Sequence, residues 1–233
     1  MGTSITMQPS TDVLLGVAAN PMIVTTNTFD STIDLFTKST STEWIIDVET
    51  NGLNPYDMHQ LCGIGISTTN DKDNIYYFPF RHQSEEANLS QSDLNKLVEC
   101  INTKCKTLVG YNVKFDAKFL ENEGIDIQAM DLVDVLVMVR MTEPTTINQL
   151  SLTDTIIRSY GDDAGKYDID TKQILRKNKW TKDFSLAPPS ILGPYCIKDV
   201  EWTRRVYFDR LKKLDETKQS ELFKFQCDLT KTL

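Results

Sequence analysis

The chain has 233 residues, which is enough for one large domain or two small ones with a substantial hydrophobic core. Lys and Arg number 25 against 33 Asp and Glu, so the net charge of -8 argues against a protein that coats nucleic acid through a basic surface. Five cysteines at irregular spacing predict reduced thiols in a cytoplasmic protein, and the two histidines, His59 and His82, are too few for a histidine-rich zinc site.

Hydrophobic periodicity predicts strands and helices over most of the chain, and no apolar run approaches the length of a membrane span. Residues 1–20, which are rich in Ser and Thr, are expected to be a poorly ordered N-terminal extension. Strands are expected at residues 22–25, 43–49, 61–67, 75–80 and 108–110. Helices are expected at residues 29–36, 90–101, 113–123, 132–141, 150–160, 171–177 and 194–214. A strand meander followed by alternating strands and helices predicts an α/β domain over residues 21–213, with a mixed sheet flanked by helices.

The strand expected at residues 43–49 carries two carboxylates, Asp47 and Glu49, at its end. Side chains alternate between the faces of a strand, so residues two apart project from the same face. Like charges held side by side repel each other, and burial penalises both of them. A divalent cation such as Mg²⁺, which prefers oxygen ligands, would offset that cost. The alternative is an exposed strand end with two solvated acids.

Asn112 and Asp116 share one face of the helix expected at residues 113–123, because they lie four residues apart. Asn112 is at the helix start, where an amide caps well. On its own, Asp116 is more commonly a solvated helix residue than a ligand.

Tyr195 and Asp199 are also four residues apart, on the helix expected at residues 194–214, so they too share a face. Pro194 suits the first position of that helix. A core tyrosine whose hydroxyl bonds a helix carboxylate would explain this pair equally well in isolation.

Together, the order Asp-x-Glu, Asn-x3-Asp and Tyr-x3-Asp resembles the DEDD (DnaQ-like) superfamily of 3′–5′ exonucleases, in its tyrosine branch. The chain from residue 43 to about residue 213 looks like the proofreading domain of family A DNA polymerases. The similar segments are residues 47–53, 63–67, 150–152, 160–161 and 199–203. Residues 23–26 are similar to phage-encoded members, which would act in the host cytoplasm. Between Tyr195 and Asp199 the chain departs from the family, with Cys196, Ile197 and Lys198 where small or acidic residues are expected.

The resemblance implies a ribonuclease H-like fold and hydrolysis with two divalent cations, Mg²⁺ or Mn²⁺. Asp47 would bridge both ions, and Glu49 and Asp199 would complete the site that activates water. Asp116 would hold the second ion. Tyr195 would orient the attacking water, because a phenol with a pKa of about 10 is a poor base at neutral pH.

Three more positions match residues near the terminal nucleotide of the substrate. Leu53 and Asn112 would pack against or bond that nucleotide, and Thr50 would contribute through its backbone. Single-stranded 3′ ends bind by stacking and local backbone contacts, which an acidic protein can provide.

Other charged residues have simpler interpretations. Asp131 and Asp134 precede an apolar segment and are expected to cap a helix, and Ser90 with Asp93 resembles a capping box. The acids at 162–163 and 168–170 are expected to be solvated in a polar loop. A solvated helix face, rather than a DNA contact, is expected for the basic residues Lys172, Arg176, Lys177, Lys179 and Lys182.

Three functions remain open at this point. The first is proofreading of DNA by a module cut or split from a family A polymerase, which would be its partner. The second is a free-standing exoribonuclease resembling ribonuclease D, which a following helical RNA-binding domain would favour. The third is a non-catalytic nucleic-acid-binding module, which a replaced carboxylate would favour; all four carboxylates are present.

The C-terminal segment 214–233 carries an amphipathic stripe at helical spacing, formed by Leu222, Phe225, Leu229 and Leu233. In the proofreading domains this segment leads into the polymerase, so we expect the stripe to dock on a polymerase domain or partner. The alternative is that it folds back and completes the nuclease core.

Overall fold

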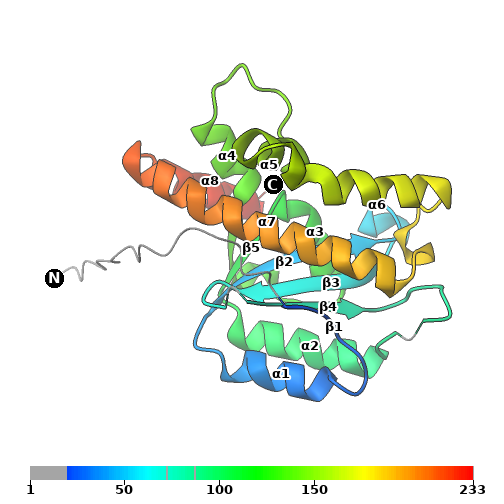
Figure 1. Cartoon of the computed structure of the whole chain (residues 1–233). Helices are drawn as coiled ribbons and strands as arrows, with labels where there is room; N and C mark the ends of the chain where they lie inside the picture. The colour runs from blue at the N-terminus through cyan, green and yellow to red at the C-terminus, as the bar shows by residue number, and fades with distance from the viewer. Residues whose placement is uncertain (1–19, 72, 87, 233) are drawn as a thin grey trace.

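The computed structural model describes residues 20–71, 73–86 and 88–232, and its centre is a six-stranded sheet (Figure 1). The strand order is β1-β4-β3-β2-β5-β6. The central strands β2, β3 and β4 pair antiparallel, whereas the outer strands pair in parallel with their neighbours. The strands are β1 (Asn20–Ile23), β2 (Glu43–Thr50), β3 (Leu61–Thr68), β4 (Asn74–Pro79), β5 (Thr107–Gly110) and β6 (Asp131–Asp134). This mixed sheet with flanking helices confirms the predicted ribonuclease H-like α/β fold.

Helices cover both faces of the sheet. They are α1 (Phe29–Lys38), α2 (Gln91–Lys104), α3 (Val113–Asn122), α4 (Val135–Thr142), α5 (Leu152–Tyr160), α6 (Lys166–Lys177), α7 (Pro189–Glu216) and α8 (Ser220–Thr232). Short 3-10 turns lie at η1 (Pro55–Asp57), η2 (Ile127–Ala129), η3 (Asp162–Gly165) and η4 (Phe184–Leu186). Among the described residues, no helix is both long and apolar enough to cross a membrane.

Strand β2 divides the hydrophobic core into two layers. Trp44 and Ile46 pack with the side chains of α1, α2 and α3, whereas Ile45 packs with those of α4, α5 and α7. Because side chains alternate along a strand, Asp47 and Glu49 continue the row of Ile45 and face α7. The strand period therefore directs both carboxylates to the side of the sheet that α7 covers.

The segment 131–134 differs from the expected helix, because it forms strand β6. It pairs in parallel with β5, placing Leu132 opposite Leu108, and the edge of the sheet is thereby extended. Helix α4 begins only at Val135 and is capped by Asp134, whose side chain accepts from the N–H of Leu136. Periodicity alone cannot assign such a short apolar run. Asp131 is exposed in the strand and is not a helix cap, contrary to expectation.

Two helices begin earlier than their sequence patterns predict. Helix α6 starts at Lys166, so residues 168–170 lie in a helix and not in a polar loop. Helix α7 starts at Pro189, and Pro194 lies inside it rather than at its first position.

The predicted capping box of α2 is confirmed, with reciprocal hydrogen bonds between Ser90 and Asp93. The expected N-terminal extension lies outside the described residues, apart from Asn20.

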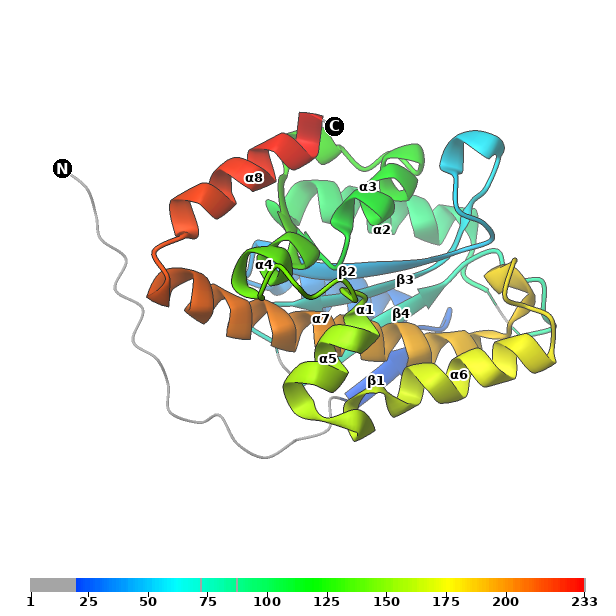
Figure 2. The same ribbon diagram turned by 90° about the horizontal axis from the view of Figure 1, so that it is seen from above.

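Helix α8 turns back from the end of α7 and packs on β6 and α4 (Figure 2). Phe223 is its buried anchor, and Thr230 is buried on the same helix. Leu222 and Phe225 of the predicted stripe are 53% and 55% exposed, so they do not complete the core. The helix therefore folds back onto the nuclease through a different face from the stripe; Leu233 lies outside the described residues.

Candidate active site

Four carboxylates from three elements converge between β2, α3 and α7. Asp47 and Glu49 lie on β2, Asp116 on α3 and Asp199 on α7. Asp116 accepts a hydrogen bond from the N–H of Val48, at 3.0 Å, which fixes α3 against the strand. Asp116 and Glu49 are only 3% and 4% exposed. All four predicted acids are thus brought together by the fold.

The electrostatics of the cluster are those of crowded acids, of which Glu49 and Asp116 are buried and Asp47 and Asp199 are half-buried. Burial raises the pKa values of Asp47, Glu49 and Asp199 well above their ordinary range, and the charges of neighbouring carboxylates raise them further. Burial likewise raises the pKa of Asp116 to about 8, although hydrogen bonds from backbone N–H groups oppose the shift. Without a cation, the cluster therefore resists holding its full negative charge.

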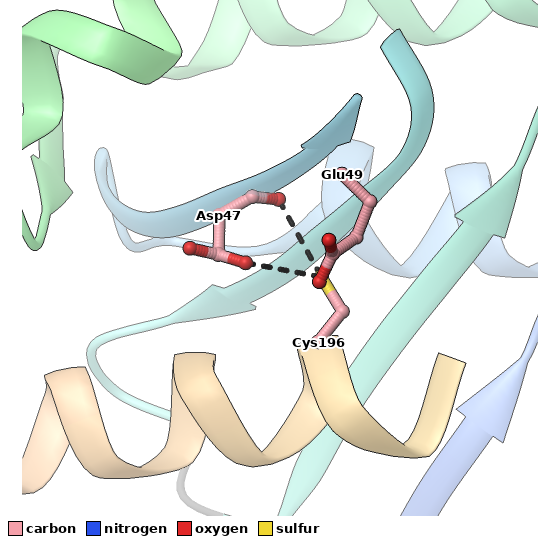
Figure 3. A group of neighbouring side chains, drawn as sticks. All are labelled: Asp47, Glu49 and Cys196. Carbon is pink, nitrogen blue, oxygen red and sulfur yellow. Dashed lines mark hydrogen bonds between the residues drawn. The ribbon is translucent and has the colours of Figure 1, made fainter. Parts of the chain in front are cut away.

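One fully buried oxygen of the cluster has no hydrogen-bond partner. Glu49 Oε1 is buried and accepts no hydrogen bond. Asp47 Oδ2, by contrast, accepts a hydrogen bond from the Cys196 thiol, with 3.4 Å between Sγ and Oδ2 (Figure 3). Ligand atoms of Asp47, Glu49 and Cys196 lie within 4.8 Å of one another. A buried carboxylate oxygen without a partner is a place where a cation supplies the missing interaction. The donor set, rich in carboxylate oxygens, fits Mg²⁺ or Mn²⁺.

Cys196 approaches the acids because β3 carries a glycine beneath it. A Cβ at Gly65 would lie 2.7 Å from Cys196 Sγ, so any larger residue would push α7 away from the sheet. Burial and the charge of Asp47 raise the pKa of Cys196, so its thiol stays protonated and donates to Asp47.

Tyr195 lies beside the cluster, and its hydroxyl reaches an acid that was expected to be solvated. Its hydroxyl donates to Asp168 Oδ1 at 3.1 Å, and Asp168 is 4% exposed. The expectation that Asp168 is solvated in a loop was therefore wrong, because α6 carries it against α7. Asp168 and Lys172 lie four residues apart and form an ion pair. This spacing in the sequence could have indicated that Asp168 lies on a helix.

The predicted substrate residues line two adjoining clefts beside the acids. Leu53, 82% exposed, and Phe115 line both clefts, which measure about 430 and 370 Å³. Glu49 and Thr50 border the first cleft and Asn112 borders the second. The Thr50 hydroxyl donates to the carbonyl of Gly52 at 2.6 Å. The structure thus gathers these positions around one groove, formed by the two adjoining clefts, that reaches Glu49.

Asn112 does not cap α3 through its amide, contrary to expectation. Its φ of 62° is a left-handed conformation that Asn tolerates better than most residues. Its N–H donates to Asp134 Oδ1 at 2.9 Å, so Asp134 holds both this turn and the start of α4.

Lysines also border the groove. Lys182 lines the first cleft, and Lys114 and Lys118 line the second. Lys182, one of the basic residues predicted to lie on a solvated helix face, is exposed as predicted but follows the end of α6. Lys114 and Lys118 were not singled out from the sequence, although their position beside Asp116 was a signal.

Comparisons with known proteins agree with this geometry. A family model described as 3′-5′ exonuclease matches residues 22–215. A search of curated proteins returned no match. Among solved structures, NrnC from Brucella melitensis with bound Mg²⁺ is 16% identical, with a TM-score of 0.57 and 83% of each chain covered.

Two other solved structures share the fold. The catalytic core of RRP6 from Trypanosoma brucei is 15% identical, with a TM-score of 0.60 over 93% of this chain and 53% of that one. RNase D from Escherichia coli is 12% identical, with a TM-score of 0.53 over 91% of this chain and 49% of that one. At these identities the likeness establishes the fold, while the family model covers most of the sequence. The chain belongs to the DnaQ-like 3′–5′ exonuclease family and is a hydrolase.

Proposed function

We propose that this protein is a metal-dependent exonuclease that removes nucleotides from single-stranded 3′ ends of DNA, as the proofreading module of a family A DNA polymerase. The observation that carries the proposal is the convergence of four carboxylates around a buried Glu49 oxygen that lacks a partner. A purely structural cluster would be expected to satisfy that oxygen within the protein.

In the proposed mechanism, Asp47, Glu49, Asp116 and Asp199 would hold the two cations, with Glu49 and Asp199 also serving the attacking water. Two bound Mg²⁺ or Mn²⁺ ions would lower the pKa of the attacking water and stabilise the leaving 3′ oxygen. The protein supplies the remaining positioning. The Tyr195 hydroxyl donates to Asp168, so its oxygen lone pairs remain free to accept a hydrogen bond from the attacking water.

The groove supplies a path for the single strand. Leu53 and Phe115 lie where the two clefts adjoin, so the terminal base can stack on their apolar surface with its phosphate toward Glu49. The lysines of the two clefts would neutralise the phosphates further along the strand. This local basic lining explains how a protein of net charge -8 can hold a polyanion.

A free-standing exoribonuclease resembling ribonuclease D is the second candidate. Similarity to the RNase D and RRP6 structures favours it, because RNase D is an exoribonuclease involved in structured RNA processing. The phosphodiester hydrolysis would be the same, but the preferred substrate would be RNA instead of DNA. A non-catalytic module finds no support in the site, since every carboxylate is present and clustered.

The substrate is tested by incubating the protein with labelled single-stranded DNA and RNA of one sequence, in Mg²⁺, Mn²⁺ or excess EDTA. We expect stepwise shortening from the 3′ end, faster on DNA and abolished by EDTA. Strands blocked at the 3′ end are the matched control. Faster cleavage of RNA would favour the second candidate, and undiminished cleavage in EDTA would contradict the metal-dependent mechanism.

The proposed polymerase partner is tested through the outer face of α8. Replacing the exposed Leu222 and Phe225 with Ser should leave the melting temperature nearly unchanged, since exposed substitutions usually alter stability by less than about 0.5 kcal/mol. Binding to a family A polymerase from the same genome should be lost in a pull-down with purified proteins. Phe223→Ser is the contrasting control, because Phe223 is buried and its loss should lower the melting temperature. Unchanged binding by the double variant would contradict docking through this face.

A further inference from the structure

Two consecutive residues of α6 hydrogen-bond two site residues of α7. Tyr167 donates its hydroxyl to Asp199 Oδ1 at 2.5 Å, and Tyr195 donates its hydroxyl to Asp168 Oδ1 at 3.1 Å. The rings of the two tyrosines lie 6.0 Å apart. Helix α6 runs alongside the amino-terminal part of α7, which brings these pairs together (Figure 2). One helix thus supports both a predicted metal ligand and the residue predicted to orient water.

Asp168 is the acceptor in the second pair, and it is held in place from its other side. Lys172, one turn further along α6, approaches Asp168 Oδ1 at 2.8 Å. The carboxylate is 5% exposed at its side chain, so its charge is nearly desolvated and is compensated by one lysine and one phenol. A charged acceptor makes a stronger hydrogen bond than a neutral one. Asp168 therefore constrains the direction of the Tyr195 O–H bond.

The direction of the hydrogen bond from Tyr195 to Asp168 suits the reaction. An ordinary phenol has a pKa of about 10, so the Tyr195 hydroxyl carries its proton at neutral pH. With that proton directed at Asp168, the phenol oxygen can only accept from a water molecule. An attacking water donates hydrogen bonds to its neighbours, so a phenol oxygen that accepts one of them orients the water without taking its proton. In the first pair, the Tyr167 hydroxyl bonds Asp199 Oδ1, and Asp199 also interacts with the Tyr195 hydroxyl.

We propose that Tyr167 and Asp168 are positioning residues of the exonuclease site: Asp168, anchored by Lys172, directs the hydroxyl of Tyr195, and Tyr167 orients Asp199 as a metal ligand. The assignment rests on the proposed nuclease function. Neither residue needs to touch the substrate, since each acts through its partner on α7.

A double-mutant cycle tests the action of Asp168 through Tyr195. Asp168→Asn should lower kcat about tenfold with KM unchanged, because the acceptor loses its charge. Tyr195→Phe should lower kcat by about tenfold to a hundredfold, since it removes the orienting oxygen. The double variant should be no slower than Tyr195→Phe, because Asp168 then has no hydroxyl to direct. If Asp168→Asn slows Tyr195→Phe as much as it slows the wild type, the assignment of Asp168 is overturned.

A second arm tests Tyr167 without altering any charge. Tyr167→Phe should raise the Mg²⁺ concentration needed for half-maximal activity several-fold, with kcat at saturating Mg²⁺ retained. Binding of Mn²⁺, measured by calorimetry without substrate, should weaken in parallel. Tyr160→Phe is the matched control, since Tyr160 donates to Asp209 between α5 and α7, and it should change neither quantity.

These outcomes separate the inference from the function on which it rests. An unchanged Mg²⁺ requirement in Tyr167→Phe, with wild-type activity intact, would overturn the assignment of Tyr167 alone. A wild-type protein that binds Mn²⁺ but cleaves neither DNA nor RNA would overturn the proposed function. Melting temperatures of every variant would show whether a loss of activity reflects unfolding, and the charge-neutral Tyr167→Phe keeps α6 testable if Asp168→Asn is unstable.

Discussion

Asp47→Asn and Asp199→Asn are each expected to reduce cleavage by about a thousandfold or more. A bound divalent cation contributes several kcal/mol to the stabilisation of the transition state, and each 1.36 kcal/mol is about a tenfold change in rate. The amide removes a charge that no water can replace. Single-turnover rates on a labelled single-stranded 3′ end, at saturating Mg²⁺, would measure the loss.

The same two variants should be more stable than the wild type when metal is absent. Burial, followed by the charges of neighbouring acids, raises the pKa values of Asp47 and Asp199, so ionising them near neutral pH costs the metal-free fold free energy. An amide of similar shape removes one of those charges. Thermal unfolding in EDTA should therefore give higher melting temperatures for the inactive variants, which also excludes misfolding as the cause of inactivity.

Asp134→Ala is the control for these substitutions. Asp134 is buried, yet its oxygens accept from the N–H groups of Asn112 and Leu136. Its loss should cost about 1–2 kcal/mol as a missing helix cap and leave cleavage measurable. If a folded Asp134→Ala protein were as inactive as Asp199→Asn, the assignment of the fourth carboxylate to Asp199 would be in error.

Metal binding and pH are expected to be strongly linked in this protein. Burial raises the folded-state pKa of all four acids, and that of Asp116 to about 8. When folding raises the pKa of an acid, the folded protein keeps a proton that the unfolded chain releases. The free energy of unfolding is therefore highest below the unfolded pKa, about 4, and falls as the pH rises to the folded pKa. The melting temperature of the metal-free protein should therefore fall between about pH 5 and about pH 8.

Mg²⁺ should remove most of that fall, because it binds the ionised carboxylates of the folded state only. The increase in melting temperature caused by saturating Mg²⁺ should thus be small at about pH 5 and largest at about pH 8. Asp116→Asn should flatten the pH dependence of the metal-free protein, since it deletes one raised pKa. A metal-free melting temperature that rises across this range would contradict the charge crowding inferred for the cluster.

Much of the site could be predicted from the sequence because it depends on short-range geometry. The period of two on β2 directs Asp47 and Glu49 to one face, and the spacing of four on α7 does the same for Tyr195 and Asp199. These relations hold wherever the strand and the helix pack. The capping box of α2 was predictable for the same reason, since its hydrogen bonds join residues three apart.

Tertiary structure alone decided the features that depend on distant partners. Strand β6 exists because β5 offers an unpaired edge, and no local pattern distinguishes its apolar residues from the first turn of α4. Asp168 became a buried acceptor only when α6 packed beside Tyr195, and Cys196 reached Asp47 only because Gly65 allowed α7 to approach β3. The exposed face of α8 was likewise determined by packing, because the opposite face of the helix contacts β6 and α4. Local periodicity specifies which side chains share a face, whereas the burial and hydrogen bonding of each side chain depend on contacts between residues far apart in the chain.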